Sequence, residues 1–310
     1  MINKVRLQKI TRGEIKDSIL RSGYLIEKTV GEMISQHGYF VAPNPTYLDP
    51  ITGKTREIDI QADSDLMEPD TVLEGITWNI YCECENNQQP VVFFPYEPLF
   101  SHELSENIKC CGLPMKIWVN GKYMDIFSFL RFHRFHHYCK GNVATQYCSF
   151  VQDKKEKKWV ATHLEEQHDT FNSLVLSIEN TLSDFYHVWE PPEQGETEPI
   201  FIQCIYPLIV LGGDLMEARL DRKGLKVSRT KHVQFIKTMY LDRKPVDYQI
   251  DVVAQDYIEQ YLSIIDVEMA KLNRLIKRHK RTLLNSISHI LEDVKQLQKP
   301  VDSYRKVLTS

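Results

Sequence analysis

Two short stretches with strict two-residue alternation most constrain how this chain of 310 residues can fold. The first, residues 56–62, places Asp59 on the face opposite its isoleucines, and the second, residues 78–85, places Glu83 and Glu85 opposite its apolar residues. Because successive side chains of a strand point to opposite faces, two neighbouring strands would direct three carboxylates to one point. Oxygen ligands that converge in this way suit Mg²⁺, which binds through one or two carboxylates and keeps several waters.

A helix with a fourth acid is predicted before these strands. From about residue 14 to residue 37, apolar residues recur with helical period, at Leu20, Tyr24, Val30 and Ile34. Glu27 falls within this stripe. A carboxylate that faces a core is costly unless it meets a cation or hydrogen-bond donors. Glu27 therefore either pairs with a buried Arg or lies at the edge of the stripe, or it joins the acids of the two strands.

The order of these elements resembles the PD-(D/E)XK, or restriction-endonuclease-like, nuclease superfamily. The resemblance covers roughly residues 14–120 and expects a further helix near residues 101–111 and a strand at 115–119. It implies an α/β fold, an αβββαβ core with a mixed sheet that cleaves phosphodiester bonds with Mg²⁺, for which Mn²⁺ can substitute.

The same resemblance implies roles for the four acids. Asp59 and Glu83 correspond to the two metal-binding acids, and Glu27 corresponds to the helix acid. Glu85 stands where the family motif has a lysine and Ile58 where it has a proline. Glu85 is then expected to be a general base or a further metal ligand, with the missing cation supplied by Lys28 or by Lys109.

The function implied is a Mg²⁺-dependent DNA endonuclease, acting in bacterial defence or DNA processing. The alternative is a degenerate core that binds DNA or protein without catalysis. A target of RNA is not excluded by the sequence.

Composition fits a cytoplasmic enzyme. The chain is 42% hydrophobic and 26% charged, and it has no apolar run of the ~18 residues that a membrane span requires. Its N-terminus lacks the apolar core of a signal peptide, and seven cysteines without regular spacing indicate reduced thiols. We predict a nuclease core at 1–140, a mixed α/β region at 141–254 that either stands apart or extends the same sheet, and a basic helical segment at 255–310.

Charge is distributed unevenly along the chain. Residues 271–310 hold ten Lys/Arg against three Asp/Glu, a local charge of +7. Because the net charge of the whole chain is −4, residues 1–270 carry −11. Basic segments beside an acidic core are typical of proteins that bind a phosphate backbone, although a solvated helix face has the same composition. The candidate nucleic-acid-binding residues are Lys277, Arg278, Lys280 and Arg281, together with Arg131 and Arg134 in an aromatic and basic stretch.

Several patterns follow residue 120. A hairpin is predicted at 146–162, a helix at 164–188, and strands at 200–211, 215–220, 232–240 and 248–254, with the first two of these strands forming a hairpin around Gly212-Gly213. The Ile250-Asp251 pair echoes Ile58-Asp59, but no second acidic strand follows it, so we interpret it as strand patterning. A zinc site would draw on His133, His136, His137, Cys139 and Cys148, whose spacing matches no zinc finger or ribbon.

The chain ends in a predicted helix from about residue 255 to residue 298. Its last part carries a heptad-like seam of Leu283, Ile287, Ile290, Val294 and Leu297. Such a seam either packs against the body of the protein or forms a homodimer, and paired active sites would suit an enzyme that cuts both strands of a duplex.

Overall fold

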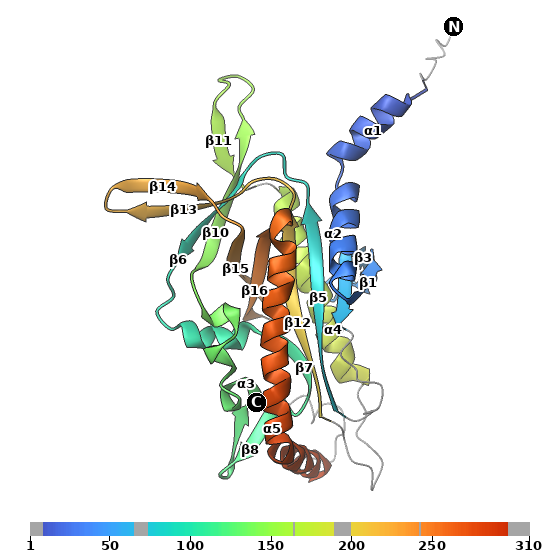
Figure 1. Ribbon diagram of the computed structural model, residues 1–310, viewed down its shortest axis with the longest axis vertical. Coiled ribbons are helices and arrows are strands. Elements are labelled where there is room, and N and C mark those ends of the chain that lie inside the picture. Colours follow the sequence, from blue (N-terminus) through green and yellow to red (C-terminus); the bar gives the residue numbers. More distant parts are fainter. Residues whose placement is uncertain (1–8, 65–73, 164, 189–199, 242, 297–310) are drawn as a thin grey trace.

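A mixed sheet of twelve strands organises the computed structural model, which describes residues 9–64, 74–163, 165–188, 200–241 and 243–296 (Figure 1). Ten strands lie side by side in the order β1-β4-β5-β12-β16-β15-β10-β6-β13-β14, while β7 pairs with β12 and β11 pairs with β10. The strands are β1 (Tyr39–Pro43), β4 (Ile60–Ser64), β5 (Glu74–Glu85), β6 (Val91–Tyr96), β7 (Lys109–Leu113), β10 (Val143–Gln152), β11 (Trp159–Thr162), β12 (Ile200–Leu211), β13 (Leu215–Asp221), β14 (Gly224–Arg229), β15 (His232–Leu241) and β16 (Lys244–Ala254).

Two small hairpins stand outside this sheet. They are β2 (Thr46–Leu48) with β3 (Thr55–Glu57), and β8 (Lys116–Val119) with β9 (Lys122–Asp125). The α-helices are α1 (Arg12–Arg21), α2 (Tyr24–Gln36), α3 (Ile126–Phe129), α4 (Glu165–Val188) and α5 (Ile258–Gln296). Short 3₁₀ turns are η1 (Ser101–Asn107), η2 (Phe132–Arg134), η3 (His137–Cys139) and η4 (Gln255–Tyr257).

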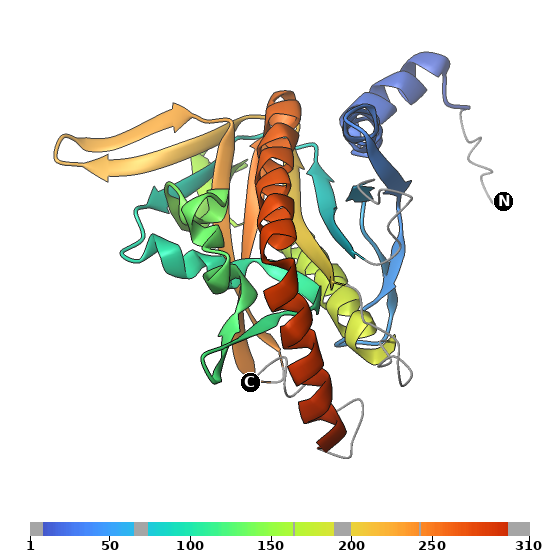
Figure 2. The same ribbon diagram turned by 60° about the horizontal axis from the view of Figure 1, so that its bottom comes forward.

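Helices cover both faces of the sheet. Ile26, Val30 and Ile34 of α2 share one apolar core with the buried side of α5, and this core includes Cys82 and Cys84 of β5. The second core lies on the other face, where α4 packs. Figure 2 shows α5 and α4 on opposite sides of β12. The side chains of β5 therefore point alternately to the face covered by α2 and α5 and to the face covered by α4.

The acids lie in the part of the fold formed by six elements. In sequence order these are α2, β1, β4, β5, α4 and β12, and the four strands among them are neighbours in the sheet in that order. β1, β4 and β5 are antiparallel to one another, whereas β12 is parallel to β5 from Ile200↔Glu74 to Leu211↔Glu85. A parallel neighbour requires a long crossover connection, and here the connection carries residues 86–164 before it reaches α4.

The structure corrects the first part of the predicted element list. The single helix expected at 14–37 is two helices, broken at Ser22 and Gly23, so Leu20 and Tyr24 are exposed rather than on the core stripe. The helix expected at 101–111 is the 3₁₀ turn η1 followed by strand β7. The strand found at 116–119 is β8, which pairs with β9 outside the main sheet.

The strand expected at 56–62 is also interrupted. β3 ends at Glu57 and β4 begins at Ile60, so Ile58 is buried in the core beside α4 while Ile60 is buried in the core beside α2. The backbone turns at Asp59, whose carbonyl accepts a hydrogen bond from the Asn44 N–H at 2.9 Å. This break places the Asp59 side chain at the end of the strand pair.

Most predictions for the rest of the chain are confirmed. β10 and β11 form the expected hairpin, and α4, β12, β13, β15 and β16 match the expected elements closely. The hairpin around Gly212-Gly213 is wrong, because β13 pairs with β6 and β14 rather than with β12. Residues 141–254 extend the same sheet, so the boundary predicted at residue 140 does not separate two sheets.

The seam of α5 packs against the body of the protein. Leu283, Ile287 and Ile290 are buried in the core that α5 shares with α2, so this part of the seam is not available to a second copy. The Val294 side chain and Leu297 lie outside the described residues. None of the described helices combines the length and the apolar character needed to cross a membrane.

Candidate active site

Asp59 and Glu83 meet where β4 and β5 adjoin. Ile60 pairs with Cys82, so one further step of the antiparallel register brings Asp59 beside Glu83. The Cys84 N–H donates to Asp59 Oδ2 at 2.7 Å, and the Glu83 carboxyl is hydrogen-bonded to the Asp59 carboxylate. Glu83 is only 8% exposed. The buried Glu83 carboxyl thus adjoins the partly buried Asp59 carboxylate.

The electrostatics of this pair follow from burial and repulsion. Burial, followed by the charge of Asp59, raises the pKa of Glu83 to about 9, and the charge of Glu85 acts in the same direction. Burial also raises the pKa of Asp59, which the Cys84 N–H partly offsets. Two carboxylates at one site cannot both ionise without a compensating charge. Near neutral pH the metal-free pair therefore holds a proton, with Glu83 as the donor and Asp59 as the acceptor.

Glu85 lies on the same face of β5 as Glu83, as alternation predicts. Its carboxylate accepts a hydrogen bond from the Thr170 hydroxyl of α4, and Ser173, one helical turn further on, hydrogen-bonds Glu83. Glu85 also lines a small apolar recess with Phe93 and Tyr147. α4 therefore orients both glutamates of the strand.

Glu27 reaches the site from the other face of the sheet. It is half-buried on α2, and burial followed by the charge of Asp59 raises its pKa. Glu27 and Asp59 line one open cavity of about 430 Å³, together with Lys28. No Arg contributes to the pKa of Glu27, whose electrostatic neighbour is Asp59, and its partial burial places it at the edge of the buried stripe of Ile26, Val30 and Ile34.

The two lysines proposed to supply a cation differ in position. Lys28 lines the cavity of Glu27 and Asp59, where it lies 3.8 Å from Glu32. Lys109 is not on a helix but on β7, with its ammonium over the Tyr248 ring. Lys109 pairs with Ile205, which pairs with Asn79 of β5, so Lys109 lies two strands from β5 and four residues, or roughly 13 Å at about 3.3 Å per residue, short of Glu83 along the strand direction. Of the two lysines, Lys28 is the one that lines the same cavity as Glu27 and Asp59.

The predicted nucleic-acid-binding residues are exposed, and those on α5 lie away from the acids. The parallel strands β5, β12 and β16 have their C-terminal ends on the same side of the sheet, and α5 begins there at Ile258. Lys277 follows 19 residues later, roughly 30 Å along the helix at 1.5 Å per residue. The other exposed members are Arg278, Lys280 and Arg281 on α5, with Arg131 and Arg134 at η2.

A second cluster of ionisable groups is buried between η3, β15, β16 and α5. His137 donates through Nε2 to Asp251 and through Nδ1 to Glu268, each at 2.9 Å. Burial alone would lower the pKa of His137, but these two carboxylates raise it to about 10. His232 and Tyr261 complete the hydrogen bonds of Asp251. Sequence reasoning missed this cluster and interpreted Asp251 as strand patterning.

The nitrogen and oxygen atoms of His136, His137 and Glu268 lie within 4.8 Å of one another, close enough to hold a metal ion. The hydrogen bonds favour protons instead. His136 Nδ1 accepts the Tyr138 N–H at 3.1 Å, which leaves its proton on Nε2, and both nitrogens of His137 donate to carboxylates. Of the five residues considered for zinc, only His136 and His137 belong to this group. We interpret the cluster as an ion network that fastens α5 to the sheet.

Comparisons with known proteins add no family to this description: no protein-family model, no curated protein and no solved structure matches the chain. The functional argument therefore depends on the geometry of the acids.

Proposed function

We propose that this protein is a Mg²⁺-dependent endonuclease that cleaves DNA phosphodiester bonds on a restriction-endonuclease-like core. One observation carries the proposal: the buried Glu83 carboxyl hydrogen-bonds the partly buried Asp59 carboxylate at a strand break, and the charges of Glu85 on one face of the sheet and of Glu27 on the other act on this pair. The order α2-β1-β4-β5-α4-β12 supports it, because these six elements follow an αβββαβ order when the β2–β3 hairpin and residues 86–164 are set aside, with α4 and β12 in place of the helix and strand expected at 101–119.

The donor atoms fit a hard divalent cation. They are the carboxylate oxygens of Asp59 and Glu83. The proton that these two groups share in the metal-free protein reduces their repulsion, and a bound cation would do the same. Mg²⁺ is bound in proteins by one or two carboxylates with water and substrate phosphate, so Asp59 and Glu83 would hold it, and Mn²⁺ would substitute. A bound ion would polarise the scissile phosphate and lower the pKa of a coordinated water.

The remaining residues then have distinct roles. Glu85, oriented by the Thr170 hydroxyl, accepts the proton of the attacking water or supports a second cation. Glu27 positions water or cation from α2, and Lys28 offers positive charge to the phosphate from the open cavity. Because the segment at 277–281 lies far from these acids, the scissile phosphate needs other contacts nearer to the edge of the sheet.

The test is cleavage of supercoiled plasmid with Mg²⁺ or Mn²⁺, by wild type and by Asp59→Ala. We expect nicking by the wild type and none by the variant, whose folding is checked by circular dichroism. Glu57→Gln is the matched control, since Glu57 is an exposed acid two residues away and outside the cluster. Wild type that cleaves neither DNA nor RNA with either metal would favour the non-catalytic binding module.

A further inference from the structure

A two-stranded ribbon begins beside Glu85 and extends away from the sheet. The Gly212 N–H donates to the Glu85 carbonyl at 2.9 Å, and the Gly213 N–H donates to the Asn87 side chain at 2.9 Å. A Cβ at Gly213 would lie 2.1 Å from the Asn87 carbonyl, so only glycine permits this approach. The base of the β13–β14 ribbon is thus held against the strand end that carries the acids.

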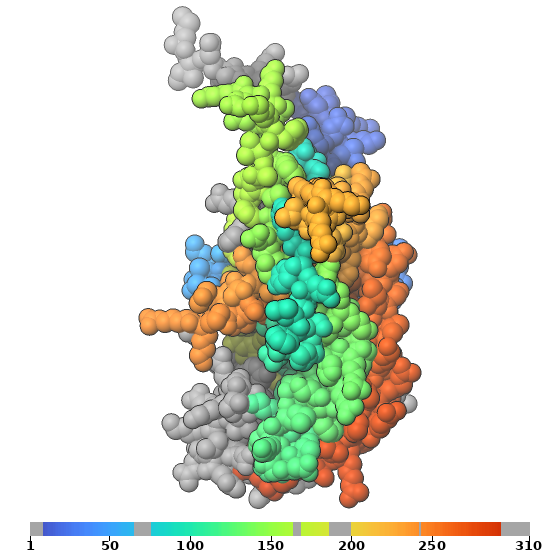
Figure 3. All heavy atoms as spheres, turned by 90° about the vertical axis from the view of Figure 1, so that its left-hand side faces the viewer, coloured from blue at the N-terminus to red at the C-terminus, as the bar shows by residue number. Residues whose placement is uncertain are grey.

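Beyond its base no third strand supports the ribbon among the described residues, and the Arg219 guanidinium lies beside the Asn142 amide. β13 pairs with β6 only over Leu215–Glu217, whereas it pairs with β14 as far as Asp221↔Gly224. Leu220 is 82% exposed and Leu225 is 65% exposed, so the outer half has apolar side chains without a core to cover them. Figure 1 shows the ribbon projecting from the body, and in Figure 3 its tip points toward the viewer. An unsupported two-stranded hairpin is at best marginally stable in water.

The ribbon is basic in a chain that is acidic overall. Residues 215–229 hold five Lys/Arg against two Asp/Glu, for a local charge of +3. Arg222 and Lys223 form its two-residue turn, and Lys226 lies directly opposite Arg219. Arg219 is neutralised by Glu217, which accepts two hydrogen bonds from its guanidinium at 3.1 and 2.9 Å, whereas Lys226 has no ion pair among the described residues.

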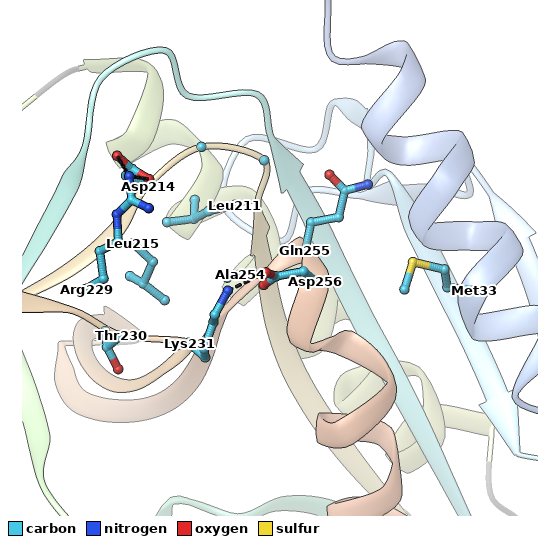
Figure 4. Close-up of a pocket in the computed structure, with 12 residues that line it drawn as sticks. Met33, Leu211, Asp214, Leu215, Arg229, Thr230, Lys231, Ala254, Gln255 and Asp256 are labelled. Carbon is cyan, nitrogen blue, oxygen red and sulfur yellow. Dashed lines mark hydrogen bonds and ion pairs between the residues drawn. The ribbon is translucent and has the colours of Figure 1, made fainter.

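The excess charge belongs to the outer half of the ribbon. A cavity of about 460 Å³ lies at its base, between the ends of β12 and β16, and two ion pairs border it (Figure 4). Arg229 pairs with Asp214 at 3.0 Å, and Lys231 pairs with Asp256. These cations are neutralised locally, so the positive charge available to a ligand comes from the turn and from Lys226.

A second basic hairpin begins in the same neighbourhood. β10 is paired with β6 near Phe93 and Tyr147, which line the recess that holds Glu85. Its connection to β11 carries four exposed lysines: Lys154, Lys155, Lys157 and Lys158. In Figure 1 the two hairpins leave the same end of the sheet and diverge. The acids thus lie near the bases of two basic hairpins.

We propose that the β13–β14 ribbon enters the major groove of duplex DNA, with the β10–β11 hairpin contacting the backbone beside it. The inference rests on the proposed function for its substrate class. The major groove, about 12 Å wide, admits a two-stranded ribbon, and the four residue pairs beyond the contact with β6, from Ala218 to Asp221, extend roughly 13 Å at about 3.3 Å each. The exposed side chains of Leu220, Leu225 and Val227 can contact thymine methyl groups, while Arg222 and Lys223 of the turn reach phosphates.

The test measures binding of a fluorescent duplex in metal-free buffer across 50–200 mM KCl. The ribbon variant is Arg222→Gln/Lys223→Gln/Lys226→Gln, and the matched control removes the same charge from α5 as Lys277→Gln/Arg278→Gln/Arg281→Gln. We expect the ribbon variant to lose roughly tenfold or more in affinity and to flatten the salt dependence by up to about 3 log units per log unit of salt, at about 0.9 for each phosphate contact. The control should change neither quantity comparably.

Each outcome is decisive for one proposal or the other. A ribbon variant that binds like wild type, or no worse than the α5 control, overturns the ribbon inference even if plasmid cleavage is observed. Wild type that binds duplex RNA as tightly as duplex DNA also overturns it, because the A-form major groove is too narrow for side chains to read. Ribbon-dependent binding without any metal-dependent cleavage would uphold the ribbon and reject the endonuclease.

Discussion

Replacing Glu83 with glutamine should make the metal-free protein more stable and remove its response to metal. Glu83→Gln keeps the shape of the side chain and a donor for Asp59 but can carry no negative charge. In the wild type, burial and the charge of Asp59 raise the pKa of Glu83 to about 9, against 4.5 for the free side chain. Between these two values the folded state holds a proton that the unfolded state releases, so the free energy of unfolding falls as pH rises through this window.

The size of the effect follows from the length of that window. One pKa unit corresponds to about 1.4 kcal/mol. The loss of folding free energy caused by holding this proton is therefore about 1 kcal/mol at pH 5.5 and about 3–4 kcal/mol at pH 7, and it grows further toward pH 9. Glutamine has no such cost. The gain in stability of Glu83→Gln over wild type should therefore be small near pH 5 and increase steadily with pH.

The assay is urea unfolding in EDTA at pH 5.5, 7 and 8.5, with Glu57→Gln as the control that should track wild type. The same proteins are then melted in increasing Mg²⁺. A ligand that binds only the folded state at 100 times its dissociation constant stabilises by about 2.7 kcal/mol, so wild type should gain stability while Glu83→Gln gains little. A variant that is no more stable than wild type at pH 8.5 would refute the repulsion argument. An equal response to Mg²⁺ would remove Glu83 from the metal site.

Two further predictions concern other residues. Glu85→Ala should be nearly inactive in plasmid nicking, whereas Glu85→Lys should keep part of the activity by restoring the residue of the family motif; full activity of Glu85→Ala would assign the base to another group. His137→Gln should lower the free energy of unfolding at pH 6.5 by about 3–5 kcal/mol, because it leaves Asp251 and Glu268 buried without their cation. The pKa of His137 is raised from 6.5 to about 10, so its contribution is complete below pH 6.5 and is lost toward pH 10; the gap in urea unfolding between wild type and variant should narrow over that range, and a gap independent of pH would contradict the ion network.

The alternation of apolar and polar residues correctly predicted the direction of side chains within a regular strand. Alternation alone placed Glu83 and Glu85 on one face of β5, and the structure has them there because strand geometry fixes the direction of each side chain. The same rule failed at Ile58, where the backbone turns and sends the side chain to the opposite core. Nothing in seven alternating residues distinguishes a straight strand from one that breaks in its middle.

Long-range pairing was beyond the sequence. The resemblance expected its last strand at 115–119, but the strand that lies parallel to β5 is β12, and residues 86–164, which precede α4, contribute strands of their own to the sheet. Each candidate strand is apolar enough to occupy the central position. The choice between them depends on which helix can cover the second face, and α4 satisfies that condition with Phe171, Leu174 and Ile178.

In two helices of this chain an acidic residue occurs among the apolar residues that recur with helical period and form a stripe. Glu27 lies on such a stripe in α2, and Glu268 lies on one in α5, between Ile265 and Leu272. Both require a partner, and the kind of partner separates the two sites. Glu268 meets an imidazolium, so its charge is balanced within the chain and its role is structural. Glu27 meets Asp59, another acid, and that excess of negative charge among oxygen donors is what a divalent cation would neutralise.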